Sequence, residues 1–250
     1  MRRKQLLHDI EEKLQSIQQL AKKAYVSYDM EDIHQLRVNF KKMRAVIRLV
    51  QCKHSKKDIP SSLKKLYRTA GTIRDLQLHH QQLAALYTHK TTLPIQYLQL
   101  IQDEIQKQHP AYDKAYKQIS FARISKQLKH AIPYHLHRKQ YVHRNNKHLQ
   151  TIHALLSPHI TDEDIHTIRK HLKDMVYVQG YLPLPDAYKD AAQVSGDYLD
   201  SVVFVTHLKQ YNNLVPENER AMLHTIQVQF DAQHTATRRK VIKAIQQLYS

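Results

Sequence analysis

Residues 31–43 read EDIHQLRVNFKKM, and residues 163–175 read EDIHTIRKHLKDM. The two stretches lie 132 residues apart, about half the chain, and seven of their 13 positions are identical. The identical pairs are Glu31/Glu163, Asp32/Asp164, Ile33/Ile165, His34/His166, Arg37/Arg169, Lys41/Lys173 and Met43/Met175. Amphipathic helices can look alike by chance, but here the matches include polar residues that a helical core does not dictate. The repeat predicts two related halves, residues 1–157 and 158–250.

Apolar residues follow a helical spacing over nearly the whole chain. Glycine is rare, with three in 250 residues, so the sequence lacks both phosphate-binding glycine loops and the turns of a many-stranded β fold. Pro110 is expected to interrupt the fourth helix. The expected helices cover about 4–27, 30–52, 61–89, 94–130, 134–156, 161–180, 187–211, 216–231 and 234–249. Together with the repeat, these observations predict an all-α fold of two pseudo-symmetric four-helix bundles, and the cationic rows described below predict a basic channel between them.

The charge balance points to an anionic partner. The chain has 39 Lys and Arg against 22 Asp and Glu, which gives a formal net charge of +17, and it has 19 His. Its one cysteine, Cys52, excludes a disulfide framework within the chain and a cysteine-based zinc site. No apolar run approaches the ~18 residues of a membrane span. The first residues are also charged too early for a signal peptide, so we expect a cytoplasmic protein without a membrane contact.

The helix expected at 30–52 carries two parallel rows of side chains. Apolar residues at an alternating spacing of three and four form a core seam: Ile33, Leu36, Phe40, Met43, Ile47 and Val50. Cationic and titratable residues follow the same spacing one residue later: His34, Arg37, Lys41, Arg44 and Arg48. One residue is a turn of about 100°, so this second row flanks the core and spans roughly 20 Å. No acidic residue lies between Asp32 and Asp58 to neutralise it.

The second half repeats both rows. Ile165, Ile168, Leu172 and Met175 form the seam, and His166, Arg169 and Lys173 form the cationic row. Matching rows in two related bundles would face each other across a basic channel, which suits a linear polyanion better than a compact ligand. The alternative is that both rows are solvated faces, although such faces normally mix charges of both signs.

Two stretches, IHQLRVNFKKMRAVIRLV at 33–50 and LKKLYRTAGTIRDLQL at 63–78, resemble the CHAD family of histidine-containing α-helical domains. The matching positions in the first half are His34, Arg37, Val38, Lys41, Lys42, Arg44, Leu66, Gly71, Arg74 and Asp75. Those in the second half are His166, Arg169, Lys170, Lys173 and Tyr177. Val176 and Gly180 stand where the family usually has Arg and often has Glu, so the second row is one cation shorter.

The resemblance implies duplicated four-helix bundles that bind inorganic polyphosphate along a central basic channel, without catalysis. From such binding we expect a location at cytoplasmic polyphosphate granules. The residues expected to bind polyphosphate are His34, Arg37, Lys41, Arg44, Arg48, Arg74, His166, Arg169, Lys170 and Lys173. A second set of candidate residues is Lys42, Arg138, Arg144, Arg239 and Lys243. These last residues would line the same channel or form an outer surface.

Other functions fit the sequence less well. Binding of RNA or DNA by a basic helical surface is the main alternative, because net positive charge is the usual footprint of nucleic-acid binding. We expect no metal or other cofactor, since no two histidines lie four residues apart on one helix face. We also expect no enzyme activity, because no clustered carboxylates accompany the basic rows. A helical interaction protein with incidental charge is the third class.

Overall fold

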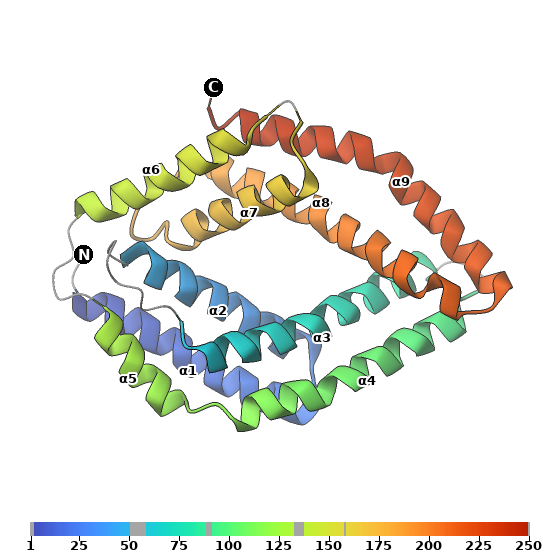
Figure 1. Cartoon of the computed structure of the whole chain (residues 1–250), viewed down its shortest axis with the longest axis horizontal. Helices are drawn as coiled ribbons and strands as arrows, with labels where there is room; N and C mark the ends of the chain where they lie inside the picture. Colours follow the sequence, from blue (N-terminus) through green and yellow to red (C-terminus); the bar gives the residue numbers. More distant parts are fainter. Residues whose placement is uncertain (1–2, 51–58, 89–91, 133–137, 158, 250) are drawn as a thin grey trace. The chain divides into compact units, whose positions relative to one another are not determined.

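The computed structural model describes residues 3–50, 59–88, 92–132, 138–157 and 159–249. Within these ranges all regular secondary structure is helical, which confirms the predicted all-α class. The helices, labelled in Figure 1, are α1 (Arg3–Ser27), α2 (Met30–Val50), α3 (Ser61–Leu86), α4 (Ile95–Lys117), α5 (Phe121–Ala131), α6 (Arg138–Leu155), α7 (Asp162–Tyr177), α8 (Asp186–Tyr211), the short 3₁₀ helix η1 (Asn212–Leu214) and α9 (Glu217–Gln246).

The chain forms two compact units, each built from three segments. Unit 1 contains Met1–Asp75, Lys107–Leu149 and Asp174–Pro183, and unit 2 contains Leu76–Gln106, Gln150–Lys173 and Leu184–Ser250. Helices α3, α4, α6 and α7 therefore each contribute residues to both units. The predicted division after residue 157 and the predicted pseudo-symmetry of the two bundles stay predictions.

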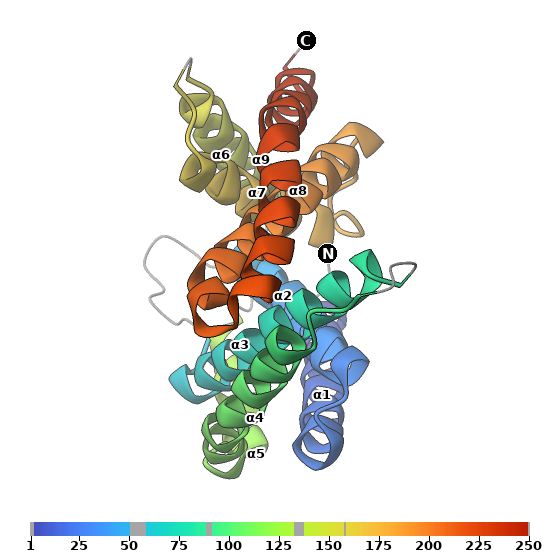
Figure 2. The ribbon, with the colours of Figure 1, turned by 90° about the vertical axis from the view of Figure 1, so that its right-hand side faces the viewer.

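In unit 1, α1 and α2 lie side by side (Figure 2). The buried face of α1 has the helical spacing expected from the sequence: Leu6, Ile10, Leu14, Ile17, Ala21 and Ala24. A sharp turn joins the two helices, with Tyr28 in the left-handed region at φ 51°. The Asp29 carboxylate then accepts hydrogen bonds from the backbone N–H groups of Glu31 and Asp32, both at 2.9 Å, and so caps α2. This turn fixes the direction in which α2 presents its side chains.

The fourth predicted helix is divided, but not at the expected place. Pro110 lies inside α4, which continues to Lys117. An exposed proline costs a helix one backbone hydrogen bond, and here the buried Tyr112 holds the next turn in place by donating to the carbonyl of Ala21 at 3.1 Å. The break comes instead before Ser120, whose hydroxyl caps α5 by accepting from the N–H of Arg123 at 3.4 Å.

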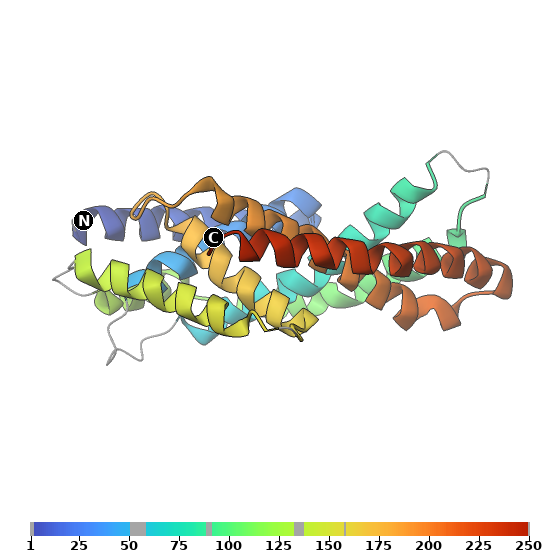
Figure 3. The ribbon, with the colours of Figure 1, turned by 90° about the horizontal axis from the view of Figure 1, so that it is seen from above.

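In unit 2, α8 and α9 lie side by side (Figure 3). The sequence prediction of two helices at 216–231 and 234–249 was wrong, because α9 runs unbroken from Glu217 to Gln246. The two residues between the predicted helices, Ala232 and Gln233, are neither glycine nor proline, so nothing in this stretch stops a helix.

A buried polar group ties α9 to the start of α4. The carboxylate of Glu219, 5% exposed, accepts from the backbone N–H groups of Gln96 and Tyr97 at 3.0 and 2.8 Å. The Tyr97 hydroxyl in turn lies 2.8 Å from Nε2 of His79, and burial lowers the pKa of that histidine to about 3. These contacts satisfy polar groups inside unit 2 and fix how α3, α4 and α9 meet.

Candidate functional site

The structure confirms the two predicted core seams. Each of Ile33, Leu36, Phe40, Met43 and Ile47 is at most 2% exposed. Each of Ile165, Ile168, Leu172 and Met175 is fully buried. The flanking residues His34, Arg37, Lys41, Arg44, Arg48, His166, Arg169 and Lys173 are all partly exposed, as a row beside the core should be. The side chain of Val50 lies outside the described part of the chain.

Arg37 of α2 lies flat against the backbone of α3. Its Nη1 donates to the carbonyl of Tyr67 at 3.5 Å, and its Cζ lies 4.9 Å from the centre of the Tyr67 ring. The next turn of α3 brings Gly71 against the same guanidinium. A β-carbon built on Gly71 would lie only 1.9 Å from Nη1 of Arg37, which real atoms do not tolerate. The space that Arg37 occupies therefore exists because residue 71 has no side chain.

Unit 2 contains the same arrangement on different helices. Arg169 of α7 lies against Gly196 of α8, where a built β-carbon would be 3.1 Å from Nε and 3.2 Å from Nη2 of the arginine. Nε of Arg169 is buried and has no hydrogen-bond partner among the described residues. The repeated arginine thus meets a glycine of the following long helix in each half of the chain.

An aspartate follows each of these glycines by four residues. Asp75 lies 3.9 Å from Nη2 of Arg37, so it pairs with a cation on the neighbouring helix. In unit 2 the same position is Asp200. The negative charges of Asp197 and Asp200 raise the pKa of Lys173, but burial and the positive charge of Arg169 lower it by more, so the pKa is lowered on balance. Arg37 in unit 1 and Lys173 in unit 2 are therefore each influenced by carboxylates of the following long helix.

The far end of the α2 row has a different environment. Nη1 of Arg48 donates to Oδ2 of Asp174 at 2.7 Å, and Nη2 of Arg44 lies 3.9 Å from Oδ1 of the same carboxylate. The side chain of Asp174 is only 7% exposed. The sequence expectation of an unneutralised row was therefore incomplete, because the neutralising acid lies 126 residues beyond Arg48.

His34 begins the α2 row in a cationic environment. Burial lowers its pKa, and so do Arg74, Lys41 and Arg37, while Glu31 acts in the opposite direction. Arg74 itself is held by the start of α2, where its Nη1 donates to the carbonyl of Met30 at 3.2 Å. The structure thus brings together the first three residues of the row and Arg74.

The remaining predicted residues are more exposed. Lys42 is half-buried on α2, and Lys170 is exposed on α7 with its Nζ 4.0 Å from Glu163. Arg144 on α6 is half-buried, whereas Arg239 and Lys243 on α9 are exposed. The side chain of Arg138 lies outside the described residues. No acidic residue occurs between Asp113 and Asp162, so the sequence around α5 and α6 is uniformly basic.

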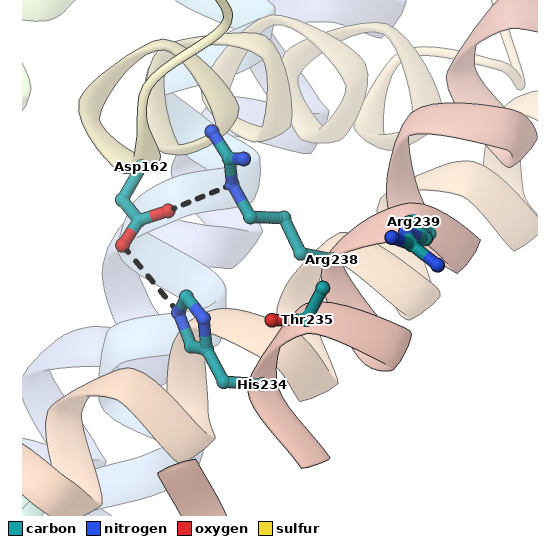
Figure 4. A pocket seen from close by; sticks show the side chains of 5 residues that line it. All are labelled: Asp162, His234, Thr235, Arg238 and Arg239. Carbon is teal, nitrogen blue, oxygen red and sulfur yellow. Dashed lines mark ion pairs between the residues drawn. The ribbon is translucent and has the colours of Figure 1, made fainter. Parts of the chain in front are cut away.

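Arg239 also borders a cavity of about 530 Å³ in unit 2, together with Asp162, His234, Thr235 and Arg238 (Figure 4). Oδ1 of Asp162 accepts from the Tyr198 hydroxyl at 2.6 Å and lies 3.5 Å from Nε of Arg238. Oδ2 of Asp162 lies 3.7 Å from Nε2 of His234. These mutual contacts join the start of α7 to α8 and α9, and they indicate a structural role.

Two features of the described residues bear on other functions. Within the described ranges, no three His, Cys, Asp or Glu side chains are grouped so as to hold a metal ion. In the same ranges, no helix has the length and apolarity needed to cross a membrane.

Comparison with known proteins identifies the family. The model of the CHAD domain matches residues 8–182, which is more than two thirds of the chain. This protein belongs to the CHAD domain family. No curated protein matches this CHAD domain.

Two solved structures share the fold of this CHAD domain. The crystal structure of the CHAD domain from the plant Ricinus communis superposes with a TM-score of 0.67 and 18% sequence identity, covering 96% of this chain and 88% of that one. PptA from Streptomyces chartreusis superposes with a TM-score of 0.71 and 13% identity, covering 96% of this chain and 98% of that one.

Sequence reasoning missed Gly196, Asp174 and Asp200 as parts of this site. A signal for two of them exists in the sequence, because Gly71 and Asp75 are separated by the same four residues as Gly196 and Asp200. Asp174 has no such signal, since its partners lie in another segment of the chain.

Proposed function

We propose that this CHAD domain binds long-chain inorganic polyphosphate through the cationic rows of α2 and α7, without catalysing a reaction. Family membership supports the ligand class. The observation that carries the proposal is the repeated placement of an arginine against a glycine, Arg37 on Gly71 and Arg169 on Gly196. The same unusual contact in both halves is typical of a duplicated binding device and not of a solvated surface.

The proposed ligand contacts follow from the chemistry of each cation. The guanidinium groups of Arg37, Arg169 and Arg74 present planar forks that suit phosphate oxygens, whereas lysine acts as a movable point charge. His34 and His166 add donors that strengthen when protonated. The full proposed set is His34, Arg37, Lys41, Arg44, Arg48, Arg74, His166, Arg169, Lys170 and Lys173, with Lys42, Arg138, Arg144, Arg239 and Lys243 as further contacts.

We further propose that these rows line a basic channel. Polyphosphate carries neither bases nor sugars, so a narrow channel would favour it over bulky duplex DNA. Among the described residues, no three His, Cys, Asp or Glu side chains are grouped so as to hold a metal ion such as the Mg²⁺ used in phosphoryl transfer, which supports a binding role. A cytoplasmic location at polyphosphate granules would follow from such binding.

Direct competition tests the proposal. Labelled long-chain polyphosphate is bound to the protein at physiological salt, and RNA or duplex DNA is added at equal phosphate concentration. We expect the labelled polyphosphate to stay bound, and unlabelled polyphosphate to displace it. Preferential displacement by RNA or DNA would overturn the proposal in favour of nucleic-acid binding.

A further inference from the structure

We propose that Gly71 and Gly196 are positioning residues for the phosphate-binding arginines, an inference that rests on the proposed function. Each glycine leaves a space on a helix surface into which one guanidinium fits. The side chain absent at these positions therefore decides where the fork of Arg37 or Arg169 points.

The backbone does not explain either glycine. Both lie in the interior of long helices, α3 and α8, and neither has a positive φ. Glycine in a helix interior is less favourable than alanine. Two of the three glycines of the chain nevertheless occupy such positions, each against the repeated arginine. Contact with the arginine accounts for both.

The contacts around Arg37 hold the guanidinium in one orientation. The Tyr67 ring lies 4.9 Å from Cζ, and the Tyr67 carbonyl accepts from Nη1 at 3.5 Å. Asp75 lies 3.9 Å from Nη2. Arginine has five N–H donors, so these contacts leave donors for an anion while they restrict rotation of the fork. The arginine side chain is 17% exposed, which leaves it reachable by a ligand.

A β-carbon would disturb the two positions unequally. At Gly71 it would lie 1.9 Å from Nη1 and 3.1 Å from Cζ of Arg37, so the guanidinium would have to leave its place. At Gly196 the distances to Arg169 are 3.1 and 3.2 Å, so a shift of a few tenths of an ångström suffices. Because the clashing atoms end a flexible side chain, alanine should displace the arginine and leave the helix intact.

The test uses alanine at each of the three glycines. Gly180 is the matched control, because a β-carbon there would meet nothing within 4 Å. We expect Gly71→Ala to weaken polyphosphate binding about tenfold, as for a lost charge-assisted contact, and Gly196→Ala about two- to threefold. Gly180→Ala should bind as the wild type does. The Tm of the Gly71 and Gly196 variants should stay unchanged or rise, since alanine favours helix.

A double-mutant cycle then identifies the route of the effect. In an Arg37→Lys background, which keeps the charge but lacks the fork, adding Gly71→Ala should change affinity by less than about twofold. An equally large loss in that background would overturn the inference, because Gly71 would act independently of Arg37. Equal affinity of wild type and Gly71→Ala would also overturn it. If the wild-type protein itself fails to bind polyphosphate, the proposed function falls.

Discussion

The two ends of the cationic row on α2 are alike in sequence and different in what holds them. At the first end, Arg37 rests on the backbone of α3 beside Gly71, with a half-exposed carboxylate 3.9 Å away. At the far end, Arg44 and Arg48 share the buried carboxylate of Asp174. The half-exposed carboxylate of Asp75 offsets the charge of Arg37 only weakly, whereas the buried carboxylate of Asp174 offsets much of the charge of Arg44 and Arg48.

This difference separates ligand binding from stability within one helix. The positive charge of the row is most available to an anionic ligand at the end that contains His34, Arg37 and Lys41. The end that contains Arg44 and Arg48 also pairs with the buried carboxylate of Asp174 inside unit 1, so its contribution to ligand binding is weaker and comes with a structural role. A row of cations that looks uniform in the sequence is thus expected to respond to mutation in two distinct ways.

The largest effect on binding is expected from the two repeated arginines. Arg37→Ala combined with Arg169→Ala should weaken polyphosphate affinity about a hundredfold, because two charge-assisted contacts are lost. The control is Lys22→Ala with Lys23→Ala, at exposed positions of α1. It removes the same amount of charge and should reduce polyphosphate affinity much less. Fluorescence anisotropy with labelled polyphosphate measures affinity, and circular dichroism follows helicity and Tm. Unfolding of the arginine variant would show that these residues serve structure instead.

Mutation of the far end of the row should mainly lower the free energy of unfolding. Arg44→Ala with Arg48→Ala leaves the carboxylate of Asp174 buried without these partners, at a cost of ~2–3 kcal/mol in the free energy of unfolding. Urea denaturation measures this cost, and adding Asp174→Asn should restore part of it by removing the charge. A large loss of affinity with unchanged stability would erase the distinction between the two ends.

The smallest effect concerns pH. Burial and Arg74 lower the pKa of His34 in the free protein, and a bound phosphate chain would raise it, so binding takes up a proton. Affinity should therefore rise about two- to threefold as the pH falls from about 8 to 6. The free energy of unfolding of the ligand-free protein has the opposite pH dependence, because it decreases as the pH falls. The stability contributed by neutral His34 is present above an unfolded pKa of ~6.5 and is lost as the pH falls through the folded value.

Calorimetry at pH 6 and pH 8 measures the pH dependence of binding. His34→Gln with His166→Gln is the variant, and His8→Gln with His224→Gln is the control, because both control residues are exposed on other helices. If the first variant keeps the full pH dependence, other histidines are the sensors.

Local patterns predicted most of the fold. The alternating spacing of Ile33, Leu36 and Phe40 predicts a buried helix face whichever helix packs against it, so the sequence alone is enough to identify that face. The start of α7 could be predicted for a similar reason. The Thr161 hydroxyl accepts from the N–H of Asp164 at 3.2 Å, and the Asp164 carboxylate accepts from the N–H of Thr161 at 2.8 Å. Such reciprocal caps involve neighbours only.

Two of the errors come from contacts between segments that lie far apart in the sequence. Pro110 was expected to interrupt a helix because proline lacks the N–H group for one backbone hydrogen bond. In the structure, the packing of the buried Tyr112 against α1 outweighs that loss. The role of Asp174 was hidden because a charge count along one helix omits acids from distant segments. Gly196 was hidden for another reason. Its separation from Arg169 is 27 residues, while that of Gly71 from Arg37 is 34, so the repeat loses its register between them.

The carboxylate of Glu219 has a consequence for the time course of folding. It supplies the acceptor for the first N–H groups of α4, yet it lies 122 residues beyond Tyr97 in the chain. At a synthesis rate of ~5–20 residues per second, roughly 6–25 s separate the emergence of these two residues from the ribosome. During that interval the opening turn of α4 must rely on water. Unit 2 therefore reaches its final hydrogen bonding only once its last helix has been made.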